Sequence, residues 1–399
     1  MMLLVITIGI VFGSGSIYRY AYSYNLIMFG TMAIMTGLVF YLIFTPSYDN
    51  KIKSYSLNIS GLILIAFFMF FPTMSDVINQ VKSYQISYFY IYFIFISFLL
   101  APKAREKIFN YYLIIIVLLS FVSLFYFFIE LVSELPDYLP YYGIPKNTWL
   151  HFYYFWSKPV TEMIITRNQS IFWEPGAFGF HLIIATLLAV KANKKLYLSI
   201  LIITCLTTMS TTVYLFLLLL VIYYMFHSKN RIRYFIIMSI SLVMLLATIK
   251  VIFGSFEIPK QILGVITEKF SPTGSGFSSM QERNQYVFAS LELFYDNLFI
   301  GAGHYSTDTE LQGTGSETSA LAALPAELGL FGLLCILLYI RFFRHFKLFA
   351  IPIGLLWLNG EFFQYTPIAL FILVHVLEEL SIKLFPSSVR VPNRLRLTT

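Results

Sequence analysis

Residues 110–129 read NYYLIIIVLLSFVSLFYFFI, a run of twenty residues without a charged side chain. A helix of about 20 apolar residues is long enough to cross the hydrocarbon core of a bilayer. The rest of the 399-residue chain has the same character, because 58% of its residues are hydrophobic and only 12% are charged, against about 25% in a soluble protein. The sequence therefore predicts an all-α polytopic membrane protein. Outer-membrane barrels are excluded, because their strands alternate apolar and polar residues.

Apolar runs of this kind predict about twelve transmembrane helices, which form one integral membrane domain over residues 1–399. They cover 2–17, 25–45, 57–72, 86–101, 110–132, 176–190, 195–209, 211–227, 234–253, 318–340, 346–360 and 364–384. The polar residues Ser210, Thr211 and Thr212 interrupt one apolar stretch and predict the tip of a short hairpin there. The first span lacks a basic leader and a clean cleavage site, so we expect it to be retained.

The net charge of +7 lies mostly between the predicted spans. If the N-terminus is cytoplasmic, the inside loops and the tail hold 18 of the 27 Lys and Arg residues, as the positive-inside rule expects. This distribution predicts cytoplasmic N- and C-termini, and it explains the charge without nucleic-acid binding. The sequence has no phosphate-binding loop, no HExxH and no Cys/His cluster with metal-ligand spacing. We therefore expect no nucleotide, metal or other cofactor.

Two outside loops, 133–175 and 254–317, are much longer than the others. Long loops without a soluble domain tend to be functional. Only three arginines face outward, Arg19, Arg167 and Arg283, so each long loop holds one of them. A guanidinium group suits phosphate better than an ammonium group does, and we expect these two loop arginines to bind an anion. The alternative is that they anchor lipid headgroups or pair with carboxylates of the loops.

The residues after Arg167 predict that this arginine lies beside the start of a helix. They include FWEPGAFG at Phe172–Gly179. Proline is favoured at a first helical position, so we expect Pro175 to begin the span and Glu174 to cap it. Arg167 is then held close to the mouth of the sixth span.

Arg283 has a parallel setting in the second long loop. Ser279–Glu282 matches the Ser-x-x-Glu capping box and predicts a helix over 280–297, with Arg283 in its first turn. The sequence then reads NLFIGAGHY at 297–305. This glycine turn either brings His304 and backbone amides to a ligand or only ends the helix.

These motifs, taken in order, resemble the superfamily of O-antigen polymerases and O-antigen ligases. The resemblance covers about residues 160–340. It rests on Arg167 with FWEPGAFG, on Arg283 ahead of NLFIGAG, and on ELGLFG at Glu327–Gly332. It implies a metal-independent membrane glycosyltransferase with a GT-C-like architecture. Such an enzyme works on the periplasmic face of the bacterial inner membrane and takes glycan from undecaprenyl diphosphate.

Within this superfamily, the sequence is more similar to the polymerases. The ligases, which attach finished glycan to a lipid core, have a His-Asn pair about eight residues before the Glu-x-Gly of the last motif. Ser319 and Ala320 stand at that place here. The resemblance therefore implies polymerisation of lipid-linked oligosaccharide repeat units into O-antigen or a capsule-like polysaccharide, and ligation is the alternative.

The site residues follow from the chemistry that the resemblance implies. We expect Arg167 and Arg283 to neutralise the diphosphate leaving group. The catalytic base is expected among Glu174, His304 and Glu317. The remaining residues expected to bind substrate are Trp173, Gly301, Gly303 and Tyr305.

The expected partners are the undecaprenyl-diphosphate-linked glycan, as donor and as acceptor, and membrane lipid. A chain-length regulator and a flippase are further partners that this resemblance suggests. The competing class is a transporter, such as a flippase of the same lipid-linked unit. A flippase predicts repeat symmetry and polar residues spread through the spans. Here the informative residues lie in two loops on one face, which favours the enzyme.

Overall fold

The computed structural model describes residues 2–14, 37, 102–132, 148–151, 154–157, 167–172, 174–227, 275–303, 319–360 and 366–384. Within these ranges the chain is mostly helical, which confirms the helical class. One small antiparallel sheet, of order β1-β2-β3, was not predicted. Its strands are Thr148–His151 (β1), Tyr154–Ser157 (β2) and Arg167–Asn168 (β3), all within the first long loop.

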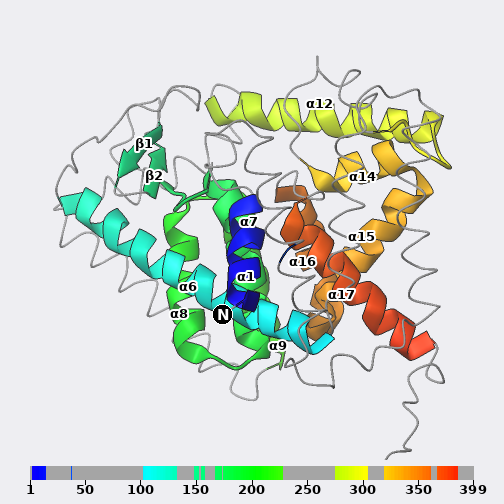
Figure 1. Ribbon diagram of the computed structural model, residues 1–399. Helices are drawn as coiled ribbons and strands as arrows, with labels where there is room; N and C mark the ends of the chain where they lie inside the picture. The colour runs from blue at the N-terminus through cyan, green and yellow to red at the C-terminus, as the bar shows by residue number, and fades with distance from the viewer. Residues whose placement is uncertain are drawn as a thin grey trace, which may run out of the picture.

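The longest described helix is α6, Pro102–Val132 (Figure 1). Its segment Ala104–Ile129 is the one helix in the described ranges that is long and apolar enough to cross a membrane by itself. Shorter apolar helices accompany it: α1 (Met2–Gly13), α7 (Pro175–Lys191), α8 (Lys195–Thr207), α9 (Thr211–His227) and α15 (Leu330–Phe342). A helix of 17 residues is about 26 Å long, against roughly 30 Å for the hydrocarbon core.

The prediction of twelve spans is therefore not supported by the part of the chain that the structure describes. Four of the predicted spans, 25–45 apart from residue 37, 57–72, 86–101 and 234–253, lie outside that part. The division of the stretch around Ser210 into two helices is confirmed, because α8 ends at Thr207 and α9 begins at Thr211. The hydroxyl group of Tyr214 on α9 donates to the carbonyl oxygen of Leu206 (2.8 Å) and closes this hairpin.

The span predicted at 318–340 is wrong as one continuous helix. It consists of α14, Ala320–Leu328, and α15, with a break at Gly329, whose φ is 60°. The span predicted at 346–360 begins instead with the short helix η1, Arg344–Phe349, which is followed by α16, Ala350–Gly360. The last described helix, α17, covers Pro367–Leu384.

The predicted start of the helix that carries Arg283 is also wrong. The helix α12 covers Ser275–Asp296 and so begins before the capping box at Ser279–Glu282. A Ser-x-x-Glu pattern does not require a helix start, because serine is tolerated inside a helix at a cost of a few tenths of a kcal/mol. Arg283 therefore lies beyond the first turn of α12.

Helix ends that the predicted topology assigns to the same side lie close together. On the predicted outer side, the hydroxyl oxygen of Ser14, just after α1, accepts a hydrogen bond from the backbone N–H of Ile368 in α17 (3.0 Å). On the predicted inner side, Arg105 near the start of α6 pairs with Glu378 near the end of α17. Figure 1 shows α12, β1 and β2 at one end of the helices and the end of α17 toward the other. Among the described helices, α17 is therefore joined to α1 near one of its ends and to α6 near the other.

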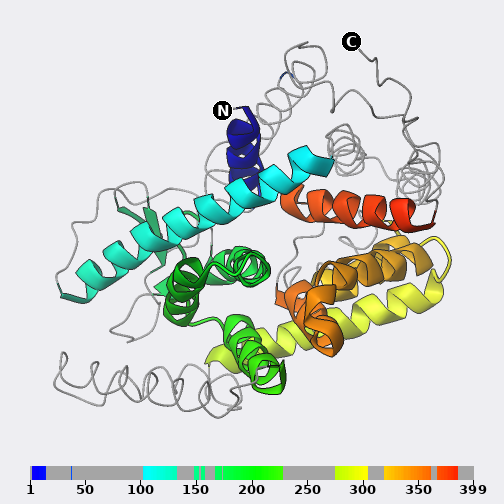
Figure 2. The ribbon, with the colours of Figure 1, turned by 90° about the horizontal axis from the view of Figure 1, so that it is seen from below.

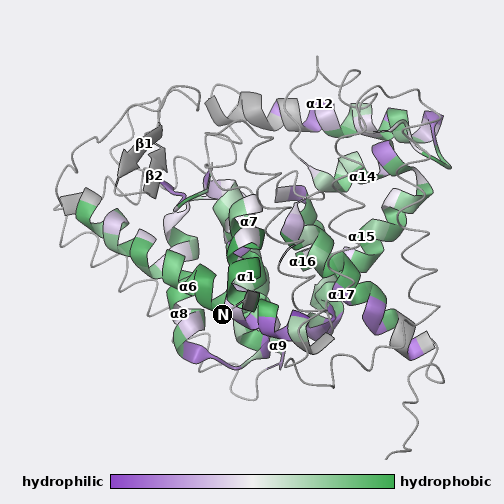
Figure 3. Cartoon of the chain, in the orientation of Figure 1, coloured by the Kyte–Doolittle hydropathy of each residue, from purple (hydrophilic) through white to green (hydrophobic). Residues whose placement is uncertain are grey.

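The apolar surface follows the same arrangement. Figure 3 shows hydrophobic residues over most of α6, α8 and α15, whereas hydrophilic residues gather at the helix ends at the bottom of the view. Along α6 the exposed residues include Leu118, Phe121, Phe125 and Phe128. Their spacing of three or four residues places them on one face of the helix. An exposed apolar face of this length is typical of a helix surrounded by lipid.

Two glycine motifs that are separate in the sequence form one packed unit. The turn after α12 lies on the break between α14 and α15. Three backbone hydrogen bonds join them: Ala302 N to Ala326 O (2.8 Å), Gly303 N to Glu327 O (3.0 Å) and Leu330 N to Leu298 O (2.8 Å). Gly301, Gly303 and Gly329 all have positive φ, which favours glycine. The close approach of the two backbones depends on these residues.

We expect Gly301→Ala to destabilise the folded protein. The new Cβ would overlap the carbonyl oxygen of Glu327, and φ is 81° at this position, where a side chain alone costs about 1–2 kcal/mol. Thermal unfolding in detergent measures the loss. Gly37→Ala is the matched control, because a Cβ at Gly37 meets no atom within 4 Å. Equal melting temperatures for the two variants would contradict the packing described.

Candidate active site

The guanidinium group of Arg167 is held against the end of α8. Its Nε donates to the carbonyl oxygen of Thr208 (3.3 Å) and one terminal nitrogen donates to that of Met209 (3.2 Å). The last carbonyl groups of a helix have no partner within the helix, and the negative end of the helix dipole lies there. A cation is therefore well placed at this position. Arg167 remains only half-buried, and its backbone pairs with Ser157 in the small sheet.

Asn168 fixes the backbone next to this arginine. Its side-chain nitrogen donates to the hydroxyl oxygens of Thr207 (2.9 Å) and Ser123 (3.2 Å), and its side-chain oxygen accepts from the backbone N–H of Ser170 (3.2 Å). These contacts join the loop to both α8 and α6. Ser170 has a positive φ of 52°, and the turn that it forms is closed by a hydrogen bond from Phe172 N to Gln169 O (3.0 Å). The position of Arg167 is therefore set by the fold.

The position also contains polar groups that have no hydrogen-bond partner among the residues that the structure describes. The amide of Gln169 and the hydroxyl group of Ser170 are buried and make no such bond. A buried polar group without a partner costs about 1–3 kcal/mol. Water or a ligand hydroxyl group beside Arg167 would remove this cost.

Phe172, which follows the turn, and His181 of α7 pack together in the core. The two rings stack at a centroid distance of 4.3 Å. The Nε2 of His181 contacts the carbonyl oxygen of Ser14 (2.5 Å) and its Nδ1 contacts the hydroxyl group of Tyr112 (2.7 Å). A carbonyl group only accepts, so Nε2 carries the proton and Nδ1 accepts from Tyr112. His181 is fully buried and ties α7 to α1 and α6.

Glu174 stands at the entry to α7. Pro175 is the first residue of the helix, as the sequence predicts. The prediction that Glu174 caps the helix is confirmed, because Glu174 is the N-cap residue and its backbone carbonyl accepts from Phe178 N (3.2 Å). Its carboxylate makes no cap hydrogen bond. This carboxylate is half-buried and lies seven residues after Arg167.

The helix that carries Arg283 lies on the same end of the molecule. Tyr286 of α12 packs on Ala322 and Ala323 of α14. Arg283 occupies a helix position three residues before Tyr286, on the face through which α12 contacts α14. The prediction that Arg167 and Arg283 act on one diphosphate remains a prediction.

Gly301 and Gly303, which were predicted to bind substrate, make packing contacts within the described residues. The backbone amide of Gly301 donates to Asn297 O (2.8 Å), and those of Ala302 and Gly303 donate to α14. These amides are therefore bonded within the protein, which supports the alternative that the turn ends a helix. Trp173, His304, Tyr305 and Glu317 lie outside the described residues.

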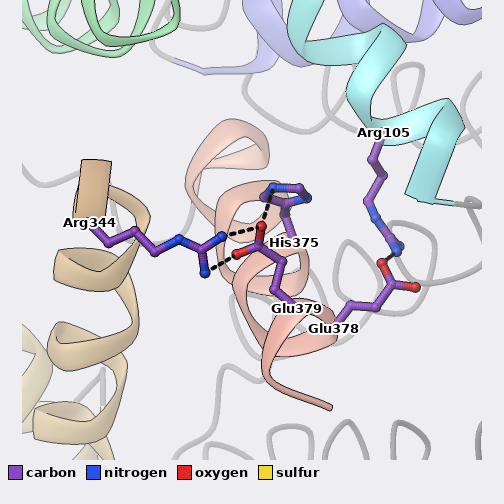
Figure 4. Close-up of polar contacts among 5 residues, drawn as sticks. All are labelled: Arg105, Arg344, His375, Glu378 and Glu379. Carbon is purple, nitrogen blue, oxygen red and sulfur yellow. Dashed lines mark hydrogen bonds and ion pairs between the residues drawn. The ribbon is translucent and has the colours of Figure 1, made fainter. Parts of the chain in front are cut away.

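A second polar cluster lies at the predicted inner ends of the helices (Figure 4). Arg344 holds Glu379 through two contacts of 2.8 Å, and Arg105 pairs with Glu378. The neighbouring His345 has its pKa lowered by partial burial and by the positive charges of Lys191 and Arg344. The cluster joins α6, η1 and α17 and belongs to the opposite end from Arg167.

Sequence reasoning missed Asn168 and the tip of the α8–α9 hairpin as parts of the site. The available signal was the polar group Ser210, Thr211 and Thr212 within an apolar stretch, which predicted the tip of a hairpin. Its contact with a loop about 40 residues earlier left no trace in the local pattern. Long-range hydrogen bonds of this kind are set by tertiary packing.

We expect Asn168→Ala to lower stability by about 1–3 kcal/mol, because it leaves the buried hydroxyl groups of Ser123 and Thr207 with fewer partners. Thermal unfolding in detergent is the measurement. Asn284→Ala is the control, since Asn284 is exposed on α12. A change in Asn168→Ala no larger than in the control would show that the contacts carry no stability.

Comparison with protein-family models, with curated proteins and with solved structures gives no match to this chain. The resemblance to O-antigen polymerases and ligases accordingly rests on the three sequence motifs alone.

Proposed function

We propose that this protein is a membrane glycosyltransferase that polymerises lipid-linked oligosaccharide repeat units. The observation that carries the proposal is the half-buried guanidinium of Arg167, held by the carbonyl groups of Thr208 and Met209 at the predicted outer ends of the helices. A fixed cation at the outer ends of the helices would lie level with the lipid headgroups. It suits the diphosphate of a lipid carrier, whose tail lies in the bilayer. Preorganised donors of this kind are the main source of rate enhancement in many enzymes.

The membrane arrangement forms part of the proposal. About twelve spans, an all-α GT-C-like architecture and cytoplasmic termini place the loops 133–175 and 254–317 on the periplasmic face of a bacterial inner membrane. The proposal is supported by two sets of polar contacts at opposite ends of the helices. The Arg105–Glu378 pair lies at the predicted inner ends, and the contacts of Arg167 lie at the predicted outer ends. Helices of 13 to 17 residues fit this arrangement where the bilayer thins locally or where polar tips are recessed.

The reaction is a displacement at C1 of the first sugar of the growing chain. The bond between C1 and the diphosphate oxygen breaks, and a bond forms between C1 and a hydroxyl oxygen of the acceptor unit. The hydroxyl proton passes to a base, and undecaprenyl diphosphate leaves with the negative charge. Arg167 and Arg283 stabilise that charge as it develops. This balance needs no redox partner and no nucleotide.

Of the three proposed bases, Glu174 is the one that the structure describes. Its carboxylate makes no cap bond to α7 and is half-buried on the chain segment that holds Arg167. His304 and Glu317 remain the other proposed bases. The donor and the acceptor are both undecaprenyl-diphosphate-linked glycans, and a flippase that delivers them and a chain-length regulator are proposed partners.

A strain that lacks this gene is complemented with the gene for Arg167→Ala. We expect no long glycan chains, because the diphosphate loses its fixed cation at a cost of about 3–4 kcal/mol in the transition state. Gel analysis of the polysaccharide measures chain length, and Arg283→Ala and Glu174→Gln are tested beside it. Lys195→Ala is the matched control: Lys195 is an exposed cation at the other end of α8 from Thr208.

The expected pattern is single repeat units in the site variants and a full ladder in the control, at equal protein levels. Normal ladders from both arginine variants would contradict the proposal. Loss of the single capped unit as well would indicate flipping or ligation in place of polymerisation.

A further inference from the structure

The helix α12 exposes a row of large apolar side chains. Phe288 is 68% exposed, Leu291 41% and Tyr295 73%, and Phe299 in the following turn is 71% exposed. Their spacing is three, four and four residues, which places the first three on one face of the helix. Apolar side chains in a continuous row of this kind mark a surface that contacts something other than water.

The row faces away from the rest of the protein. Tyr286 and Leu293, on the opposite side of α12, pack on residues of α14 and the adjoining turn. Figure 1 shows α12 lying across the ends of the other helices, and Figure 2 shows it running along one edge of the molecule. The exposed row is therefore at the rim, where the outer ends of the helices meet their surroundings.

This row is continuous with the apolar surface of α15. Leu330, at the start of α15, donates its backbone N–H to the carbonyl oxygen of Leu298 (2.8 Å). Leu298 and Phe299 thus lie beside the exposed leucines of α15, which are Leu330, Leu333, Leu334 and Leu337. If α15 spans the bilayer, as the proposed function requires, those leucines contact lipid, and the same hydrocarbon reaches α12.

The charges of α12 indicate how it contacts the membrane. Glu292 and Asp296 are the exposed charged residues beside the row. Acidic side chains gain nothing from anionic headgroups, so the attraction comes from apolar contact. The exposed charged residues beside the row are acidic and would not attract anionic headgroups. The surface therefore fits the acyl chains of bulk lipid.

We propose that α12 is an interfacial helix whose row Phe288, Leu291, Tyr295 and Phe299 enters the outer leaflet and contacts the acyl chains of bulk lipid. The inference rests on the membrane arrangement of the proposed function. It gives α12 a second role beyond carrying Arg283, because a helix anchored at this depth keeps its opposite face level with the phosphate groups of lipids.

Spin labels on α12 test the depth of this row. Phe288→Cys and Tyr295→Cys carry nitroxides on the row, and Glu292→Cys and Asp296→Cys are matched controls on the exposed polar flank. The full-length protein is placed in phosphatidylcholine vesicles, and collisions with oxygen and with a water-soluble nickel chelate are compared. Cys205 and Cys335 are buried, and unmodified protein carried through the labelling gives the background.

We expect the ratio of oxygen collisions to nickel-chelate collisions to be several-fold higher for labels at 288 and 295 than for labels at 292 and 296. Nickel access equal to that of the controls would overturn the proposal, because the row would then face water. Protection from both reagents would also overturn it, since a second copy or another part of the protein would cover the row.

The polysaccharide ladder separates this inference from the proposed function. If the row faces water and the ladders depend on Arg167, only the proposal of an interfacial helix is contradicted. If the row faces lipid and the ladders persist in Arg167→Ala, the proposed enzymatic role is contradicted and the interfacial helix is supported.

Discussion

The hydrogen bonds from the Arg167 guanidinium to the carbonyl oxygens of Thr208 and Met209 determine how the outer end of the protein is built. They join β3 to the tip of the α8–α9 hairpin, and Asn168 extends the connection to α6. The chain then turns at Ser170, buries Phe172 against His181 and enters α7 at Pro175. Each later feature of the site depends on this first attachment. It uses the unpaired carbonyl groups of a helix end, which need a donor in any apolar surrounding.

The sequence predicts the helices well where the apolar runs are long and where a special residue marks an end. Pro175 begins α7, and the polar residues near Ser210 divide α8 from α9. It fails where the cause is distant. Gly329 lies within the span predicted at 318–340, but its φ of 60° breaks the helix where the backbone N–H of Leu330 reaches Leu298, about 30 residues earlier. The three short strands around Arg167 have too few residues for an alternating pattern to be visible.

The docked glycine turn changes how the resemblance is understood. NLFIGAG and ELGLFG are two of its three motifs, and in the structure they are one packing unit held by backbone hydrogen bonds. Glycine is required there because each backbone approaches the other too closely for a Cβ. These two motifs therefore serve packing in this protein, whereas the proposed chemistry is assigned to Arg167, Arg283 and a base. The inner cluster of Arg344 and Glu379 is likewise explained as a structural connection between helices.

The central claim is that a fixed arginine at the outer end serves a transfer from lipid diphosphate. Purified protein in vesicles, supplied with the undecaprenyl-diphosphate-linked repeat unit, tests it most directly through the stoichiometry of products. We expect one undecaprenyl diphosphate to be released for each glycosidic bond formed, and both products to vanish together in Arg167→Ala. Movement of intact lipid-linked units across the vesicle membrane without release of undecaprenyl diphosphate would contradict it.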